Sequence, residues 1–480
     1  MQSSIYTIIF FPEIMLVTLT IIFLLIGLFQ KNNSFKNICN ISCIGLAFIF
    51  FLVLLNKGLF LDTYQYFFTN SPFIKFFKLL VIFGSFASII ISKNYFIDNK
   101  LNRFEIPILI LFSTLGMMVL ISSNDLISMY LGIELQSLAL YVIAAIKRDS
   151  LESSESGVKY FVLGALSSGI LLYGCSLIYG FAGSTNFSEI QNNLLNLQNL
   201  NLGLIFGLVF VLAGLAFKIS AVPFHMWTPD VYEGAPTSIT AFFAIVPKVS
   251  AVALIYRFCL EPFGSFYSEW SQIVIFLSIS SMFVGAIAAI SQKSIKRLLA
   301  YSSIGHVGYI LIGLAAASPA GVKGVIIYMT IYVMMNISVF TIILSLKSDN
   351  KFIQKITEFT GLSNKKPLVS LSLAIIMLSM AGIPPFAGFF GKFYIFLSAV
   401  ESELYFLAIL GVLSSVISAY YYLRIIKIMY FDEQNNSNFQ FNISSQSALV
   451  LIITMFFISF FIFYPTLLTS ISFDIAIDYF

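Results

Sequence analysis

Apolar runs of about 20 residues recur from one end of this chain to the other, separated by short polar connections. A helical run of that length covers the hydrocarbon core of a bilayer. The pattern therefore predicts an all-α polytopic membrane protein with about fourteen transmembrane helices. The predicted spans are Ile5–Phe29, Asn37–Leu55, Ile74–Ile91, Ile106–Ser122, Leu126–Ile146, Gly157–Tyr179, Leu202–Pro229, Pro236–Leu260, Gln272–Ile290, Leu298–Ala316, Ala320–Leu346, Leu368–Val400, Leu404–Met429 and Ser447–Leu468.

Two of these spans, the seventh and the twelfth, contain a helix-breaking proline. The seventh is interrupted at Pro223, and the twelfth at Pro384 and Pro385. A proline removes a helical hydrogen bond, and in lipid the freed backbone groups must be satisfied by protein or by a watery cavity. Interrupted spans in corresponding places of two halves indicate a transport site.

The basic residues in the connections predict the orientation of the chain. If the N-terminus faces outside, 17 of the 26 lysines and arginines lie in cytoplasmic connections, five lie on the outer side and four lie inside spans. This asymmetry follows the positive-inside rule, so both termini are predicted on the outer, periplasmic side. The five outer residues are Lys57, Lys75, Lys78, Arg257 and Lys323.

The spans predict a single membrane domain over residues 1–480. Three N-terminal helices occupy 3–102, a first five-helix unit occupies 103–260, a second occupies 269–430, and one C-terminal helix occupies 446–470. Because five is odd, the two units would cross the membrane in opposite senses and form an inverted repeat. The longest connections, Ala182–Asn201 and Lys347–Pro367, are too short to be separate domains.

Composition excludes several classes of protein. With 59% hydrophobic residues, 10% charged residues and a mean hydropathy of +0.94, the chain is not water-soluble. The net charge of +4 is small and its lysines are dispersed over short loops, which argues against nucleic-acid binding. Cys39 and Cys43 share a helix face, but no histidine or carboxylate joins them, so no metal site is expected.

Four ionisable residues at membrane depth are the main candidates for chemistry: Glu134, Lys218, Lys248 and Lys392. Each costs about 2.5–3.5 kcal/mol in the bilayer centre, and such residues mark ion pathways. Burial favours the neutral form of a lysine, whereas a nearby carboxylate favours the charged form. A Glu134–Lys218 pair would therefore act as a proton switch, although their spacing leaves open whether the two side chains meet.

Lys159, His225 and His306 are weaker candidates for the same proton relay. Lys159 shares a helix face with Glu155, so a surface ion pair explains it equally well. A lone membrane histidine is often only hydrogen-bonded to a neighbouring helix. Other ionisable residues have structural interpretations: Asp125 is predicted to cap the fifth span, and Asp230 and Glu233 to lie in a solvated turn or to cap a helix.

Three segments resemble the antiporter-like membrane subunits of respiratory complex I, the proton-pumping NADH–quinone oxidoreductase: Phe217–Thr237, Arg297–His306 and Gly382–Lys392. The resemblance extends over essentially the whole chain. It implies fourteen helices with two inverted five-helix repeats. It also implies a half-channel around Glu134 and Lys218, a central relay at Lys248 and an exit near Lys392. A lysine at position 392, where some sister subunits carry glutamate, favours one of the three sister subunits over the other two.

The resemblance also implies where cofactors and partners lie. NADH, flavin, iron–sulfur clusters and quinone would be bound by other subunits, and this chain has no glycine-rich dinucleotide fingerprint after a strand. The expected partners are other membrane-arm subunits, including a sister antiporter-like subunit, and the lipid bilayer. The expected location is a bacterial inner membrane, or the mitochondrial inner membrane if the chain is organellar.

Two alternative functions are compatible with the same residues. One is a subunit of a multi-subunit sodium–proton antiporter, which shares the fold but lacks a redox partner. The other is a scaffold that fills the membrane arm without conducting ions. A dry interior, with the three central lysines bonded only to backbone, would favour the scaffold.

Overall fold

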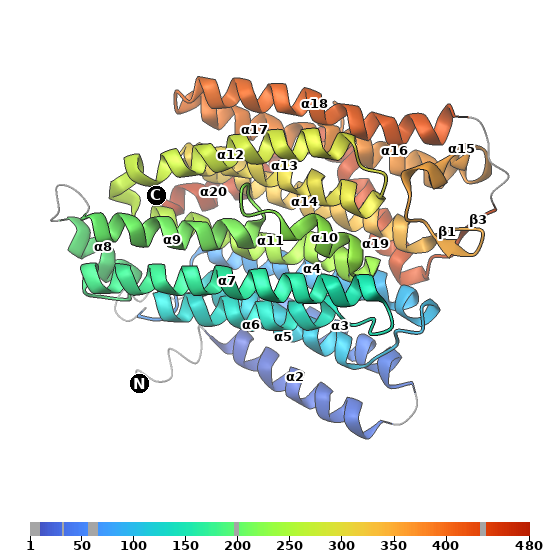
Figure 1. Ribbon diagram of the computed structural model, residues 1–480, viewed down its shortest axis with the longest axis horizontal. Helices are drawn as coiled ribbons and strands as arrows, with labels where there is room; N and C mark the ends of the chain where they lie inside the picture. The colour runs from blue at the N-terminus through green and yellow to red at the C-terminus, as the bar shows by residue number, and fades with distance from the viewer. Residues whose placement is uncertain (1–9, 31–32, 56–65, 196–200, 433–437) are drawn as a thin grey trace.

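The computed structural model describes residues 10–30, 33–55, 66–195, 201–432 and 438–480, and it forms a bundle of long, roughly parallel helices (Figure 1). Residues 5–9 of the first predicted span and Lys57 lie outside the described residues. Within the described ranges, thirteen helices are long and apolar enough to cross a membrane. The predicted all-α polytopic class is therefore confirmed.

Each predicted span except the twelfth corresponds to one long helix. The twelfth span consists of two shorter helices, α16 (Pro367–Ala381) and α17 (Ala387–Glu401). The long helices are α2 (Phe11–Phe29), α3 (Ser34–Leu55), α4 (Pro72–Asp98), α5 (Glu105–Ser122), α6 (Leu126–Ala144), α7 (Leu151–Ala182), α9 (Leu202–Ile219), α11 (Thr237–Leu260), α12 (Tyr267–Ile290), α13 (Ile295–Ala315), α14 (Pro319–Ser345), α18 (Tyr405–Tyr430) and α19 (Ser445–Phe460).

Short elements occupy the connections. They are the helices α8 (Phe187–Leu195), α10 (Trp227–Gly234), α15 (Leu362–Lys365) and α20 (Thr466–Tyr479), the 3₁₀ turns η1 (Gly264–Phe266), η2 (Ile356–Phe359) and η3 (Phe461–Phe463), and the strands β1 (Leu346–Ser348), β2 (Lys351–Phe352) and β3 (Phe439–Phe441). The strands pair antiparallel in the order β2-β1-β3 at one end of the bundle (Figure 1). This sheet was not predicted, but it adds no separate domain.

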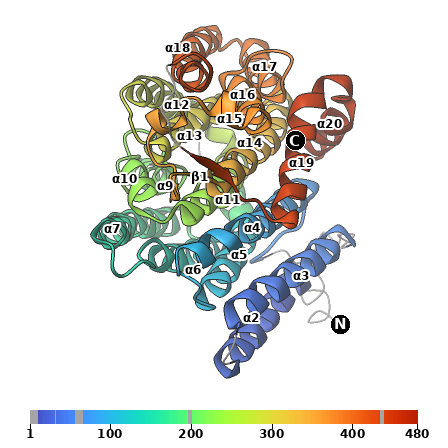
Figure 2. The same ribbon diagram turned by 90° about the vertical axis from the view of Figure 1, so that its right-hand side faces the viewer.

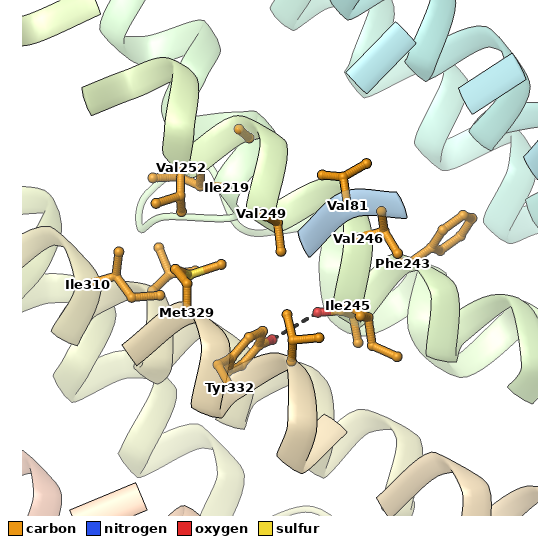
Figure 3. Close-up of a cluster of buried hydrophobic side chains, with 14 of the residues drawn as sticks. Val81, Ile219, Phe243, Ile245, Val246, Val249, Val252, Ile310, Met329 and Tyr332 are labelled. Carbon is orange, nitrogen blue, oxygen red and sulfur yellow. Dashed lines mark hydrogen bonds between the residues drawn. The ribbon is translucent and has the colours of Figure 1, made fainter. Parts of the chain in front are cut away.

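Helices α11, α13 and α14 form the centre of the bundle. Their most apolar windows are 94–100% buried, whereas those of α2, α7 and α18 are 33–39% buried. Figure 2, viewed along the helices, shows α11 and α14 in the middle and α2, α7 and α18 at the periphery. Residues around the whole circumference of α11 are buried and most of them are apolar, as expected of a helix surrounded by protein. In the core, Tyr332 of α14 donates a hydrogen bond to the Ala244 carbonyl of α11 at 3.0 Å (Figure 3).

The structure differs from two expectations drawn from the sequence, one about the C-terminal helix and one about the basic residues of the outer connections. The C-terminal helix expected over 446–470 is divided: α19 ends at Phe460, and α20 begins at Thr466. Pro465 explains the division, because a proline disfavours helical geometry in the residue before it. Lys78 and Arg257, assigned to outer connections, lie inside α4 and α11 and are buried. Lys78 pairs with Glu13 of α2 at 2.5 Å.

Candidate functional site

The break at Pro223 separates α9 from α10, and neighbouring side chains satisfy the backbone groups around it. Ser220 ends α9 with a left-handed φ of 65°. The Val222 N–H donates to Ser281 Oγ of α12 at 2.8 Å, and Trp227 Nε1 donates to the Phe217 carbonyl at 3.0 Å. Polar groups of adjacent helices therefore replace the hydrogen bonds that the helix loses, as membrane burial requires.

The break at Pro384 and Pro385 brings Lys392 to the end of α16. Lys392 Nζ donates to the Ala381 carbonyl at 2.8 Å, and Gly388 N–H donates to Ser379 Oγ at 3.0 Å. Gly382 has a φ of 88°, and a Cβ there would come within 2.8 Å of Lys392 Cδ. The lysine is thus packed into the interruption, 5% exposed.

Gly388 allows α16 and α17 to approach closely, which leads to a stability prediction. A Cβ at this position would lie 1.8 Å from the Ser379 carbonyl oxygen, a fixed backbone atom. We expect Gly388→Ala to destabilise the subunit by about 1–3 kcal/mol, because the two half-helices must separate. Gly169→Ala is the matched control, since no atom lies within 4 Å of its Cβ position. Abundance of the two variants in purified membranes measures the difference, and equal abundance would contradict the expected clash.

Lys218 lies in the last turn of α9, buried against α6. Its Nζ donates to Ser137 Oγ at 2.8 Å, and the side chain is 9% exposed. Glu134 lies one turn before Ser137 on α6, and its buried Oε1 has no hydrogen-bond partner among the described residues. No ion pair joins Glu134 to Lys218 in the described part of the chain, although their charges interact. Lys218 therefore hydrogen-bonds a serine of α6 and not the candidate glutamate.

Lys248 is at the centre of the bundle, directly after Pro247 in α11. It is 2% exposed, and its Nζ donates to Ser303 Oγ of α13 at 2.6 Å. The ring of Tyr232, from α10, lies 5.8 Å from the same nitrogen. A serine hydroxyl is both donor and acceptor, so it hydrogen-bonds the charged and the neutral amine alike.

His306 lies on α13, one turn beyond Ser303, and joins a group of tyrosines. Its Nδ1 is 2.6 Å from the Tyr328 hydroxyl and its Nε2 is 3.1 Å from the Tyr422 hydroxyl. Tyr422 also hydrogen-bonds Ser302. His306 and Lys392 line the same narrow cavity, which has no room for a water molecule, and the charges of Lys248 and Lys392 both act on the imidazole. The structure thus places His306 in a cavity with Lys392 and within electrostatic reach of Lys248.

Lys159 and His225 lie away from this buried series. Lys159 is 42% exposed and pairs with Glu155 at 2.6 Å and with Asp230 at 3.0 Å. The pair with Glu155 is the surface ion pair that the sequence offered as an explanation of this lysine. His225 is half-buried in the turn between α9 and α10, and its Nδ1 has no hydrogen-bond partner among the described residues. No hydrogen bond in the described ranges joins either residue to Lys218, Lys248 or Lys392.

Sequence reasoning missed a group of charges that we call the α10 ion cluster: Lys159, Asp230, Glu233, Lys296 and Arg297. Arg297 pairs with Asp230 at 3.1 Å and with Glu233 at 2.9 Å, while Lys296 donates to the carbonyls of Glu233 and Ala235. The cluster ties α7, α10 and α13 together. Asp230 and Glu233, predicted to lie in a solvated turn or to cap a helix, lie instead within α10 and pair with Arg297, and Asp125 caps α6 as predicted. The i,i+3 spacing of the two acids was a signal for a shared face, but nothing in the sequence pointed to Arg297 as their partner.

The sequence is similar to proteins of one membrane family. The family model described as NADH:quinone oxidoreductase/Mrp antiporter, TM matches residues 123–418, which include Glu134, Lys218, Lys248 and Lys392. A protein of Parvibaculum lavamentivorans called NADH-quinone oxidoreductase subunit N is 50% identical over 458 residues, covering 95% of this chain and 94% of that protein. A protein of the same name from Pelagibacter ubique is 53% identical over 433 residues, covering 89% and 90%.

Solved structures share the fold. A chain of respiratory complex I from Thermus thermophilus, with bound aureothin, has a TM-score of 0.79 and 28% identity over 96% of this chain and 99% of that one. A chain of the Mrp complex from Dietzia has a TM-score of 0.83 but only 18% identity, over 97% of each chain.

Proposed function

Since this chain belongs to the NADH:quinone oxidoreductase/Mrp antiporter family of transmembrane subunits, we propose that it is a proton-translocating membrane subunit of an NADH–quinone oxidoreductase. The observation that carries this proposal is the series of buried amines at Lys218, Lys248 and Lys392. Each comes from a different helix, and each is hydrogen-bonded to a hydroxyl or a carbonyl inside the bundle. Buried amines with single, exchangeable partners are suited to carrying a proton.

The contacts support a route of proton transfer in two parts. In the first part, Lys218 turns between Ser137, which holds it now, and Glu134, one helical turn away. Pairing with the carboxylate favours the charged amine, and separation favours release of its proton. In the second part, Lys248 exchanges a proton with Lys392 by way of His306, whose two ring nitrogens contact hydroxyl groups on either side. Repulsion between neighbouring protonated groups would drive the proton onward.

Redox chemistry belongs to other subunits in this proposal, and this chain contributes only proton transfer to the translocating oxidoreductase. NADH, flavin, iron–sulfur clusters and quinone would be held elsewhere in the complex. The partners would be other membrane-arm subunits, among them a sister antiporter-like subunit, and the surrounding lipid. The bacterial relatives favour a bacterial inner membrane, and the loop charges favour both termini on its outer side.

A subunit of a sodium–proton antiporter is the main rival. It is less well supported, because the relatives at about 50% identity carry the quinone-oxidoreductase name, whereas the Mrp structure is 18% identical and shares the fold. Proton pumping driven by NADH in sodium-free vesicles would decide for the proposed function. The scaffold alternative would be favoured by a dry interior with the three lysines bonded only to backbone. Lys392 does bond a backbone carbonyl, but Lys218 and Lys248 bond serine hydroxyls instead, which weakens this alternative.

Replacing Glu134 tests the proposed switch. In an assembled complex, we expect Glu134→Ala to lower the number of protons pumped per electron, because Lys218 loses the carboxylate that favours its charged form. Proton uptake by proteoliposomes, compared with NADH oxidation in the same sample, measures that ratio. Glu401→Ala is the matched control, an exposed glutamate at the end of α17. A wild-type ratio in assembled Glu134→Ala would reject the role assigned to this residue.

A further inference from the structure

A cleft of about 460 Å³ opens beside the α10 ion cluster. Side chains of α7, α10 and α13 line it, together with Lys293 and Lys355 from the connections that the loop charges predict to be cytoplasmic. The cleft is large enough to hold many waters. Four carboxylates line it, those of Glu152, Glu155, Asp230 and Glu233, together with five basic side chains, those of Lys159, Lys293, Lys296, Arg297 and Lys355. It therefore places carboxylates, some of them ion-paired, at the side of the membrane from which protons would be taken.

Helix α10 joins this cleft to the centre of the bundle. On one face, Asp230 and Glu233 reach the cleft. On the opposite side, Tyr232 is completely buried, and its ring lies 5.8 Å from Lys248 Nζ. A helix of eight residues thus separates the water-accessible carboxylates from the central amine, with one tyrosine on its inner surface.

The hydroxyl of Tyr232 has no hydrogen-bond partner among the described residues, although it is buried. Ser303, the serine that holds Lys248, lies close to this hydroxyl. Leaving a hydroxyl buried and unpaired is unfavourable, and a phenylalanine would fill the same space without that cost. Thr228, one turn earlier on α10, has a second buried and unpaired hydroxyl. The hydroxyls of Tyr232 and Thr228 are therefore suited to hydrogen-bonding a group that is present only during proton transfer.

We propose that the cleft is the proton inlet of this subunit and that Tyr232 passes protons from it to Lys248. The inference rests on the proposed function and adds its entrance. In each transfer, the Tyr232 hydroxyl gives its proton to the neutral Lys248 amine, so that one O–H bond breaks and one N–H bond forms. At the same time the Tyr232 oxygen takes a proton from a water or carboxylic acid on the cleft side, which restores the hydroxyl. One proton moves inward, and no other species is consumed.

The α10 ion cluster positions the tyrosine in this scheme. Asp230 and Glu233 hold α10 against Arg297, and Lys296 holds the carbonyls at its C-terminal end. Because Tyr232 lies between the two acids along the helix, the ion pairs set how closely its hydroxyl approaches Lys248.

Tyr232→Phe tests the transfer step, since it removes only the hydroxyl. In assembled complex in proteoliposomes, we expect proton pumping through this subunit to slow by roughly tenfold, less than the ~100-fold typical of losing a positioned proton donor, because water partly replaces the hydroxyl. The solvent isotope effect on NADH oxidation should rise above that of the wild type, because proton entry becomes limiting. A purely structural role would not change that isotope effect. Tyr256→Phe is the matched control, a buried tyrosine of α11 whose hydroxyl donates to the Ile310 carbonyl at 3.3 Å.

Labelling tests the inlet. Glu155 lies on the exposed rim of the cleft, and Asp149 is exposed outside it. A bulky maleimide attached to Glu155→Cys should lower pumping, whereas the same label on Asp149→Cys should not, each compared with labelled wild-type protein. Pumping unchanged by the label on Glu155→Cys would overturn the cleft as the inlet.

The outcomes separate this inference from the proposed function. If Lys248→Ala is impaired while Tyr232→Phe pumps at the wild-type rate with an unchanged isotope effect, the inlet through Tyr232 is wrong and the relay stands. If Lys248→Ala pumps normally, the proposed function itself fails.

Discussion

Lys248→Ala is expected to stop proton transfer through this subunit in an otherwise assembled complex. Lys248 is 2% exposed, and its Nζ lies 5.8 Å from the Tyr232 ring and 2.6 Å from Ser303 Oγ of α13. Alanine leaves no titratable group at this point, and removing a positioned proton carrier slows transfer by about 100-fold or more. The ratio of protons pumped to electrons transferred should therefore fall, and tight coupling should lower the rate of quinone reduction.

A second substitution separates loss of the proton carrier from loss of packing. Lys248→Arg retains a long cationic side chain, but a guanidinium does not release its proton in proteins. We therefore expect Lys248→Arg to pump as poorly as Lys248→Ala. Lys427→Ala is the control, because that lysine is 69% exposed and pairs only with Asp432 at 3.3 Å in the described part. An assembled Lys248→Ala complex with the wild-type proton-to-electron ratio would contradict the relay.

Lys78→Met is expected to produce the largest loss of stability among these variants. Lys78 of α4 and Glu13 of α2 pair at 2.5 Å, with side chains 4% and 1% exposed. Glu13 has no other partner among the described residues. Removing the lysine leaves a buried carboxylate unpaired, which costs about 3–5 kcal/mol. The midpoint of thermal unfolding of the purified complex, and the abundance of the subunit in membranes, should both fall.

The double variant Glu13→Leu/Lys78→Met provides the internal comparison. Apolar residues of similar volume often replace a buried ion pair at little cost, so the double variant should regain most of the stability that Lys78→Met loses. Lys427→Met serves as the control, because an exposed pair contributes at most about 1 kcal/mol. If Lys78→Met is as stable as the wild type, or if the double variant is as unstable as the single one, the pair does not hold α2 against α4.

The contacts change how the relay is understood. The sequence suggested a Glu134–Lys218 pair, but the structure places Ser137 on the lysine. It also separates the two candidate histidines, because His306 shares a cavity with Lys392 whereas His225 lies in the turn between α9 and α10. The roles of these residues are predictions, of which the Glu134 and Lys248 variants test two.

The amino-acid sequence alone is enough to locate the spans, the prolines that break them and the depth of the ionisable residues. These features follow from composition over a short window, because an apolar run in a bilayer must form a helix to satisfy its backbone groups. The fold class and the family therefore follow from the order of the residues. Local rules also predicted the Asp125 cap and the Lys159–Glu155 pair, whose residues are four or fewer positions apart.

Which polar groups meet depends on the tertiary structure. Lys218 and Ser137 are 81 residues apart, Lys248 and Ser303 are 55 apart, and Glu13 pairs with Lys78 from another helix. Central helices such as α11 are buried and mostly apolar on every side, so their periodicity does not indicate which face contacts which neighbour. Partners across helices depend on how the bundle packs, and packing brings together residues that no short stretch of sequence contains.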